Sequence, residues 1–216
     1  MTAFTPTDRS RAKRLHQRAA YDRETIYPIL DAGVICHVGY AIDGQPYVTP
    51  TCYWREGDRL YWHGSSASRM LRQVKTGIPA CVTVTHFDGL VLARSGFHSS
   101  INYRCVMAFG AAIEVTDKAS KTAALEAFVE RLTPGRWAEL RPMTDQELKA
   151  TTVVSMEIEE ASAKVRTGQP ADDDEDYALD VWAGVVPIRQ IAGTVEPDPK
   201  LKASVPQPAY LDDFSL

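Results

Sequence analysis

The chain has 216 residues, a formal net charge of −4 and 44% hydrophobic residues. A chain of this length and composition can bury a substantial core, which argues against wholesale disorder. The small negative charge gives no electrostatic reason to expect a nucleic-acid-binding protein. The sequence contains no run of about 18 apolar residues and no apolar signal core, so we expect a cytoplasmic protein without membrane spans.

The beginning of the chain is polar and basic. We interpret residues 1–22 as a mobile arm whose cations form a solvated face: Arg9, Arg11, Lys13, Arg14 and Arg18. Each of the four cysteines lies in an apolar, strand-like stretch and none has CxxC or zinc-ligand spacing. This pattern predicts buried, reduced thiols and a reducing compartment.

Most of the remaining chain predicts short strands joined by tight turns. Strands are expected over residues 34–42, 47–55, 60–64, 80–86, 90–95, 102–115, 152–158 and 162–166. The near-continuous apolar run of residues 34–42 suggests burial on both faces. Asp43-Gly44 and Asp88-Gly89 are typical of hairpin turns, because a type I′ turn needs positive φ at both central residues.

Helical spacing of apolar residues appears in three places, residues 23–32, 65–76 and 120–132. The strands and helices do not alternate, so we expect a mainly β protein, a barrel with peripheral helices, rather than a doubly wound sheet. The barrel domain spans residues 23–190. Four prolines after Ile191 favour an extended, Pro-rich tail over residues 191–216.

The first candidate site is a strand that runs into a helix start. It contains His63, Gly64, Ser65, Ser68 and Arg69. A helix N-terminus favours an anion, serines donate hydrogen bonds and arginine binds two oxygens, so this step suits a phosphate monoester. The alternatives are an ordinary capped helix with a surface arginine, and a histidine that only forms hydrogen bonds within the barrel.

A second candidate lies later in the chain, where Asn102, Tyr103 and Arg104 open an otherwise apolar strand. A buried arginine there needs an anionic or carbonyl partner, whereas a solvated strand end needs none. Lys164 and Arg166 share one face of a late strand. The last candidate, Trp182, either covers a flat heterocycle or belongs to the core.

No metal site is expected, because His37, His63, His86 and His98 lie on different elements without HxH or HxxxH spacing. The GxSxG, GxGxxG and GxxxxGK[ST] patterns are also absent. Serine-hydrolase, Rossmann and P-loop chemistry therefore find no support in the sequence.

Five segments together carry a family resemblance: VICHVGYAIDGQPYVTPTCYW, RLYWHGSSASRML, NYRCVMAFGAAIEV, SAKVRTGQP and VWAGVVPI. The chain from Arg23 to Ile188 resembles the pyridoxamine 5′-phosphate oxidase-like FMN-binding split-barrel proteins. It is most similar to the branch of nitroimidazole-resistance and flavin-nucleotide-binding proteins. The resemblance implies a six-stranded antiparallel split β-barrel. It also implies a homodimer that holds FMN, in preference to FAD, in grooves between the subunits.

The resemblance also implies where the flavin binds. The phosphate would lie at the step from His63 to Arg69, with the ring along neighbouring strands that include Val48, Thr49, Pro50 and Thr51. Residues Asn102 to Arg104 of the second subunit would complete the site, and we add Lys164, Arg166 and Trp182 as cofactor contacts. His63 is our candidate catalytic residue, because an imidazole beside the ring could assist proton transfer.

The function that follows is a flavin-dependent oxidoreductase acting on a small organic molecule, with nitro compounds as candidate substrates. The alternatives are a flavin-binding or sensor module without turnover, and a haem-binding split barrel with histidine ligation. The basic and aromatic residues that bind pyridoxal phosphate in the oxidases proper have no convincing equivalent near this C-terminus, which argues against pyridoxamine phosphate oxidation.

Overall fold

The computed structural model describes residues 3–212 and 214, so the outer ends of the predicted arm and tail, residues 1–2, 213 and 215–216, lie outside the described part. The strands are Ala19–Ala20 (β1), Ile35–Ile42 (β2), Gln45–Glu56 (β3), Arg59–Ser65 (β4), Thr76–Leu92 (β5), Ser100–Glu114 (β6), Thr151–Glu157 (β7), Glu160–Arg166 (β8) and Gly184–Pro187 (β9). The α-helices are Arg23–Asp31 (α1), Arg69–Val74 (α2), Lys118–Leu132 (α3) and Asp145–Ala150 (α4). Short 3-10 turns cover His16–Arg18 (η1), Trp137–Glu139 (η2), Asp174–Ala178 (η3) and Ala209–Leu211 (η4).

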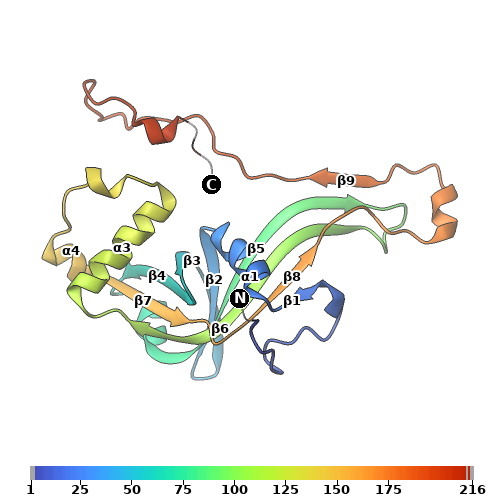
Figure 1. Cartoon of the computed structure of the whole chain (residues 1–216), viewed down its shortest axis with the longest axis horizontal. Helices are drawn as coiled ribbons and strands as arrows, with labels where there is room; N and C mark the ends of the chain where they lie inside the picture. Colours follow the sequence, from blue (N-terminus) through green and yellow to red (C-terminus); the bar gives the residue numbers. More distant parts are fainter. Residues whose placement is uncertain (1–2, 213, 215–216) are drawn as a thin grey trace.

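The strands form one antiparallel sheet that closes on itself (Figure 1). Its order is β1-β8-β6-β7-β4-β3-β2-β5-β9, and the additional pairing of β5 with β6 makes a six-stranded ring from β6 through β7, β4, β3 and β2 to β5. The predicted mainly β split barrel is confirmed. Each helix of the described part is too short or too polar to cross a membrane.

The ring encloses the larger of two cores. Inward-facing residues of successive strands fill it, among them Val38, Trp62, Val82 and Met156, which are fully buried. Because side chains alternate across a strand, the residues between them point to the outside of the barrel. Helix α2 adds Met70, Leu71 and Val74 to this core.

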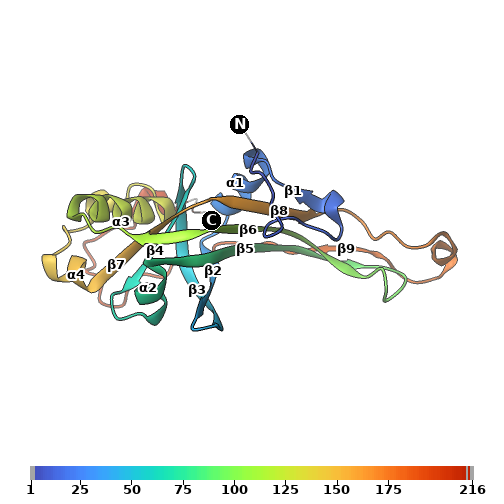
Figure 2. The same cartoon turned by 90° about the horizontal axis from the view of Figure 1, so that it is seen from below.

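A second, smaller core lies on the outside of the barrel, beneath α3. Trp54 of β3 and Val153 of β7 pack there against Leu125 and Phe128 of the helix. Figure 2 shows α3 and α2 on opposite sides of the strands between them. The two helices therefore cover different faces of the β4 region, which matters for the candidate site.

The prediction that β2 is buried on both faces is wrong. Its residues alternate between buried and exposed, with Cys36 and Val38 inside and Ile35 and His37 outside. The side chain of Ile35 is 55% exposed. One side of this apolar strand is therefore left uncovered in the single chain. Cys52, on the outside of β3, is likewise exposed rather than buried, although all four cysteines are free as predicted.

The two Asp-Gly pairs have different structures. Asp43 and Gly44 have φ values of 50° and 80°, which confirms the hairpin turn. Asp88-Gly89 is not a turn, because β5 continues through it to Leu92 with a register shift between Phe87 and Gly89. Gly89 instead permits the approach of β9, since an added Cβ would lie 2.8 Å from the Val186 carbonyl oxygen.

Beyond the barrel, β5 and β6 continue as a long hairpin, visible on the right of Figure 1. We call residues 86–103 of this hairpin, together with the paired strand β9, the arm. Its surface carries exposed apolar side chains: Phe87, Leu90, Leu92, Phe97, Ile101 and Val186. Arg94 and the carboxylate of Asp172 tie the tip of the hairpin to the loop before η3.

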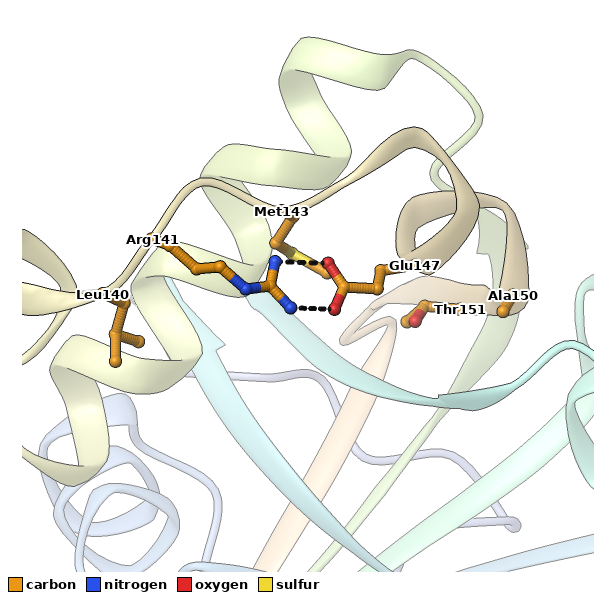
Figure 3. A pocket seen from close by; sticks show the side chains of 6 residues that line it. All are labelled: Leu140, Arg141, Met143, Glu147, Ala150 and Thr151. Atoms are coloured by element: carbon orange, nitrogen blue, oxygen red, sulfur yellow. Dashed lines mark hydrogen bonds and ion pairs between the residues drawn. The ribbon is translucent and has the colours of Figure 1, made fainter. Parts of the chain in front are cut away.

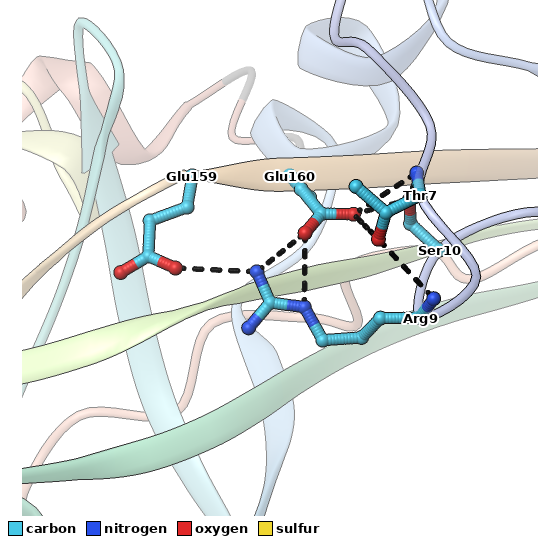
Figure 4. Close-up of polar contacts among 5 residues, drawn as sticks. All are labelled: Thr7, Arg9, Ser10, Glu159 and Glu160. Carbon is cyan, nitrogen blue, oxygen red and sulfur yellow. Dashed lines mark hydrogen bonds and ion pairs between the residues drawn. The ribbon is translucent and has the colours of Figure 1, made fainter.

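The N-terminal segment packs against the barrel. Phe4 and Ser10 are buried, and β1 pairs with β8. Figure 4 shows how the Glu160 carboxylate binds the segment: it accepts hydrogen bonds from the Thr7 hydroxyl (2.6 Å), the Ser10 hydroxyl (2.6 Å) and the Arg9 guanidinium (2.7 Å). These donors, the Ser10 hydroxyl first, lower the pKa of Glu160 to about 2.

Acidification should therefore weaken the anchoring of this segment. Because the folded state lowers the pKa of Glu160 from 4.5, its stabilising effect is present above that value and is lost as the pH falls toward 2. We expect Glu160→Gln to be less stable than the wild type at neutral pH and to lose less stability on acidification. Urea unfolding at several pH values checks this, with the exposed Glu126→Gln as control. Equal pH profiles for Glu160→Gln and wild type would contradict it.

Candidate functional site

The strand-to-helix step has the predicted local structure. β4 ends at Ser65, and Ser68 caps α2 by accepting a hydrogen bond from the Leu71 amide. The Ser65 hydroxyl oxygen accepts from the Ala67 amide at 3.2 Å. Both hydroxyls thus act as acceptors within the loop and keep their own protons for an anion.

Arg69 is the exposed cation of this step. Its guanidinium carbon lies 4.5 Å above the centre of the Tyr47 ring, and Tyr47 in turn stacks on Tyr40 at 5.5 Å. Among the described residues, Arg69 has no hydrogen bond or ion pair, so its donors face solvent. The contact with Tyr47 brings the step next to Val48, the start of the β3 segment predicted to lie along the flavin ring.

The β3 residues Val48 to Thr51 alternate in direction. Val48 is 69% exposed and points outward, as does Pro50. Thr49 points inward, where its hydroxyl lies 3.3 Å from that of Tyr40. Only half of this predicted segment can therefore contact a ligand on the outside of the barrel.

Outward residues of four neighbouring strands, β3, β2, β5 and β6, form a single surface. We call it the outer face, and its members are Ile35, His37, Val48, Pro50, Cys81, Thr83 and Met107. Three of its apolar side chains are at least 42% exposed. His37 is not among the predicted site residues, although its position between outward Ile35 and Gly39 on an apolar strand is a readable signal.

His63 lies apart from Arg69. Its ring packs edge-on against Phe128 of α3, with centroids 4.6 Å apart, and 6.0 Å from Trp54. Since Arg69 belongs to α2 on the opposite side of the strands, the structure separates two residues that the sequence placed together (Figure 2). Burial lowers the pKa of His63, so the imidazole is neutral at pH 7. Its buried Nδ1 has no partner among the described residues.

Arg104 has the carboxylate partner that a buried strand arginine requires. It donates two hydrogen bonds to Asp88, at 2.9 and 2.8 Å, which raises the pKa of Arg104 and lowers that of Asp88. Asn102 is buried and accepts from Arg166 at 2.5 Å, while its amide donates to the Gly168 carbonyl. Three of the predicted cofactor contacts, Asn102, Arg104 and Arg166, thus form polar links in or next to the arm.

The remaining candidates, Tyr103, Lys164 and Trp182, also lie toward the arm. Tyr103 pairs with Arg166 across β6 and β8, and Lys164 pairs with Cys105 on the outside of the sheet. Trp182 is 68% exposed, so the alternative that it belongs to the core is wrong. Its ring instead covers the backbone of Gly184, where a Cβ would lie 2.9 Å from it.

Three surface hollows among the described residues lie outside the predicted step. One, of about 570 Å³, is lined by His86, Asp88, Arg104 and residues 188–191. Another, of about 440 Å³, lies within the C-terminal tail. The third, of about 520 Å³, lies beside α4 (Figure 3). Arg141 binds both oxygens of Glu147 there, and Glu147 also completes the capping box with Thr144. The charged groups beside α4 therefore already pair with one another and with the helix cap. They are not free to bind a ligand in this hollow.

The model of the pyridoxamine 5′-phosphate oxidase family matches residues 22–165. No curated protein matches the chain. The flavocytochrome Anf3 from Azotobacter vinelandii is 49% identical, with a TM-score of 0.93 and 99% of each chain covered.

Two further structures are similar. The FAD and haem binding protein from Mycobacterium smegmatis is 38% identical, with a TM-score of 0.87, and the match covers 92% of this chain and 97% of that one. A putative 5-nitroimidazole antibiotic resistance protein from Bacteroides thetaiotaomicron is 22% identical with a TM-score of 0.58, over 68% of this chain and 86% of that one. At that identity the last match supports the fold alone.

Proposed function

The chain belongs to the pyridoxamine 5′-phosphate oxidase family, and from this membership we propose that it is a flavocytochrome, an electron-transfer protein that binds a flavin and a haem. The observation that carries the proposal is the 49% identity to flavocytochrome Anf3 over 99% of both chains. Haem binding was an alternative in the sequence analysis, and the relatives favour it. They also favour FAD over FMN, because the 38% identical Mycobacterium protein binds FAD.

The residues at the strand-to-helix step fit a flavin phosphate. Arg69 offers unpaired guanidinium donors, and the hydroxyls of Ser65 and Ser68 keep their protons. Val48 and Pro50 expose apolar side chains on the same strand as Tyr47, but on its opposite face. When bound, a flavin supplies hydride or single-electron exchange and a haem supplies single-electron exchange. The residues of this chain would bind and orient these groups and keep water away from them.

A haem needs fewer protein ligands than a bare metal ion does. The described residues contain no group of three His, Cys, Asp or Glu side chains that could hold a metal ion. Haem iron is already held by its macrocycle and takes only one or two axial protein ligands, so a single well-placed histidine is enough.

We further propose a homodimer with the cofactors at the subunit interface. The outer face and the arm both expose apolar side chains in the single chain. Exposed apolar side chains that gather on one region of a surface are typical of an interaction site, and a twofold symmetric pair is the commonest way to cover it. The arm extends beyond its own barrel, so it can reach a second subunit (Figure 1).

The proposal is tested on the purified protein by its absorption spectrum and by chromatography of the released cofactors. We expect a haem Soret band that shifts on reduction, together with FAD in the extract. Protein that carries flavin without haem after expression with added haem precursor would overturn the flavocytochrome assignment. FMN in place of FAD would return the cofactor to the first expectation.

Replacement of Arg69 by alanine should weaken binding of the flavin nucleotide. The loss of one charge-assisted contact is worth about 1.5–3 kcal/mol, so the dissociation constant should rise about ten-fold or more. Riboflavin has no phosphate, and its affinity should change little. Fluorescence titration of the cofactor-free protein with FAD, FMN and riboflavin measures this, with Arg131→Ala on α3 as the matched control. Equal losses for all three ligands would remove Arg69 from the phosphate site.

A further inference from the structure

The proposed flavin site leaves the hollow of about 570 Å³ unused. We call it the arm-base hollow, because it lies where β5 leaves the barrel to form the arm. Four parts of the chain line it: Ala32 at the end of α1, residues 85–88 of β5, Arg104 of β6 and residues 188–191 after β9. Figure 2 shows α1 and α2 on opposite sides of the strands, so within one chain this hollow is separate from the strand-to-helix step.

Paired strands hold the walls of the arm-base hollow in place. His86 of β5 lies directly opposite Arg104 of β6 in the register of the two strands. The amide of Ile188 donates a hydrogen bond of 3.0 Å to the carbonyl oxygen of Asp88, directly after the pairing of β9 with β5. The polar groups of the hollow are therefore positioned before a ligand arrives, which lowers the entropic cost of binding.

The hollow has a net positive charge in a chain whose net charge is −4. Its described lining contains two arginines and one carboxylate, with His86 neutral. Arg104 donates from Nε and Nη2 to Asp88, so its Nη1 has no partner among the described residues. Arg189 is exposed and has no hydrogen bond or ion pair there. Two guanidinium groups with unused donors suit a carboxylate, whereas the nearby charge of Asp88 disfavours a dianion such as a phosphate monoester.

His86 adds a hydrogen-bond acceptor to this lining. Its Nε2 lies 2.9 Å from the carbonyl oxygen of Ile29, and a carbonyl oxygen can only accept. Nε2 therefore carries the proton of the neutral ring, and Nδ1 keeps a lone pair. Since Nδ1 has no partner among the described residues, it is the ring nitrogen that can accept a hydrogen bond from a ligand hydroxyl.

Apolar residues complete the lining: Ala32, Phe87, Ile188 and Ile191. Phe87 is 45% exposed and Ile191 is 82% exposed, so both have apolar area left to bury. A ligand with an apolar body would remove this area from water, which favours binding. The volume of the hollow lies within the range of roughly 300–1,000 Å³ that is typical of small-molecule sites.

We propose that the arm-base hollow binds a small monocarboxylate that has an apolar body and a hydroxyl group. Arg189 and Nη1 of Arg104 bind the carboxylate, and Nδ1 of His86 accepts a hydrogen bond from the hydroxyl. The apolar body covers Phe87 and Ile191. The proposal goes beyond the flavocytochrome function and depends on neither cofactor.

Four probes test the ligand class on the full chain as purified, by calorimetric titration and ligand-observed nuclear magnetic resonance. 4-Hydroxybenzoate has all three features, 4-hydroxybenzamide lacks the charge, benzoate lacks the hydroxyl, and 4-hydroxyphenyl phosphate carries a dianion in place of the monoanion. We expect 4-hydroxybenzoate to bind about ten-fold more tightly than the amide or the phosphate, because each of these loses a charge-assisted contact or meets Asp88. It should bind about three-fold more tightly than benzoate.

Variants test the residues. Arg189→Gln should weaken the binding of 4-hydroxybenzoate by about ten-fold and remove most of its advantage over the amide. Lys200→Gln is the matched control, since Lys200 is an exposed cation of the same tail outside the hollow. His86→Phe should bind 4-hydroxybenzoate and benzoate equally. That variant also loses the hydrogen bond to Ile29, so its melting temperature is measured, and Arg189→Gln decides the test if it unfolds.

Several results would overturn the proposal. Equal affinities for the acid and the amide, or wild-type affinity in Arg189→Gln, would show that the arginines do not bind a carboxylate. Release of flavin or haem by 4-hydroxybenzoate would assign the hollow to a cofactor. No binding of any probe at millimolar concentration would show that the hollow is not a ligand site. None of these results bears on whether the chain is a flavocytochrome, because the spectrum and the released cofactors test that function separately.

Discussion

Gly110→Ala should strongly destabilise the barrel. An added Cβ would lie 2.2 Å from the carbonyl oxygen of Glu157 and 2.9 Å from Cγ of Met156. The oxygen belongs to the backbone of β7, so the overlap cannot be relieved by rotating a side chain. Residue 110 lies where β6 changes partner, between the pairing of Phe109 with β8 and that of Ala112 with β7.

The clash therefore acts on the contact that closes the ring. We expect a loss of about 3 kcal/mol or more in the free energy of unfolding, or failure to fold. Gly96→Ala is the matched control, because no atom lies within 4 Å of its added Cβ and its φ is not positive. That variant should stay within about 0.5 kcal/mol of the wild type. Urea unfolding measures both, and similar midpoints for the two variants would show that β7 can move away.

Local patterns predicted most of the barrel because they depend on neighbours in the sequence. Alternation, the Asp43-Gly44 turn and the helical spacing of α3 are all of this kind. The same Asp-Gly signal failed at residues 88–89, where pairing with β6 and β9 holds the chain extended. Tertiary pairing overrode local preference there. α4 was missed, although the Thr144 to Glu147 capping box was readable.

The sequence predicted the candidate site only where the interacting residues are close to one another in the chain. The capped step before Arg69 forms as its residues indicate. The partner of Arg104 is Asp88, which is brought close only by the register of β5 with β6. The position of His63 depends on which face α3 covers, and no pattern around the histidine encodes that. The same applies to His37, whose exposure follows from closure of the ring.

Phe97→Asp should convert the proposed homodimer into a monomer without unfolding the chain. Phe97 lies at the tip of the arm and is 91% exposed, so the single chain gains almost nothing from its ring. If a second subunit buries the tip, a carboxylate there is desolvated without a partner. Removal of a buried aromatic anchor and burial of an unpaired charge each cost at least about 2 kcal/mol, so the dimer dissociation constant should rise by about a hundred-fold or more.

Sedimentation at micromolar concentration measures this effect. The wild type should sediment at twice the chain mass of 23.9 kDa, and Phe97→Asp close to that mass itself. Ala123→Asp places the same charge at an exposed position on α3 and should remain a dimer. Both variants should keep the wild-type melting profile at dilutions where the wild type is monomeric. A Phe97→Asp protein that remains dimeric would show that the arm tip lies outside the interface, and a monomeric wild type that still binds flavin would contradict a cofactor site shared between subunits.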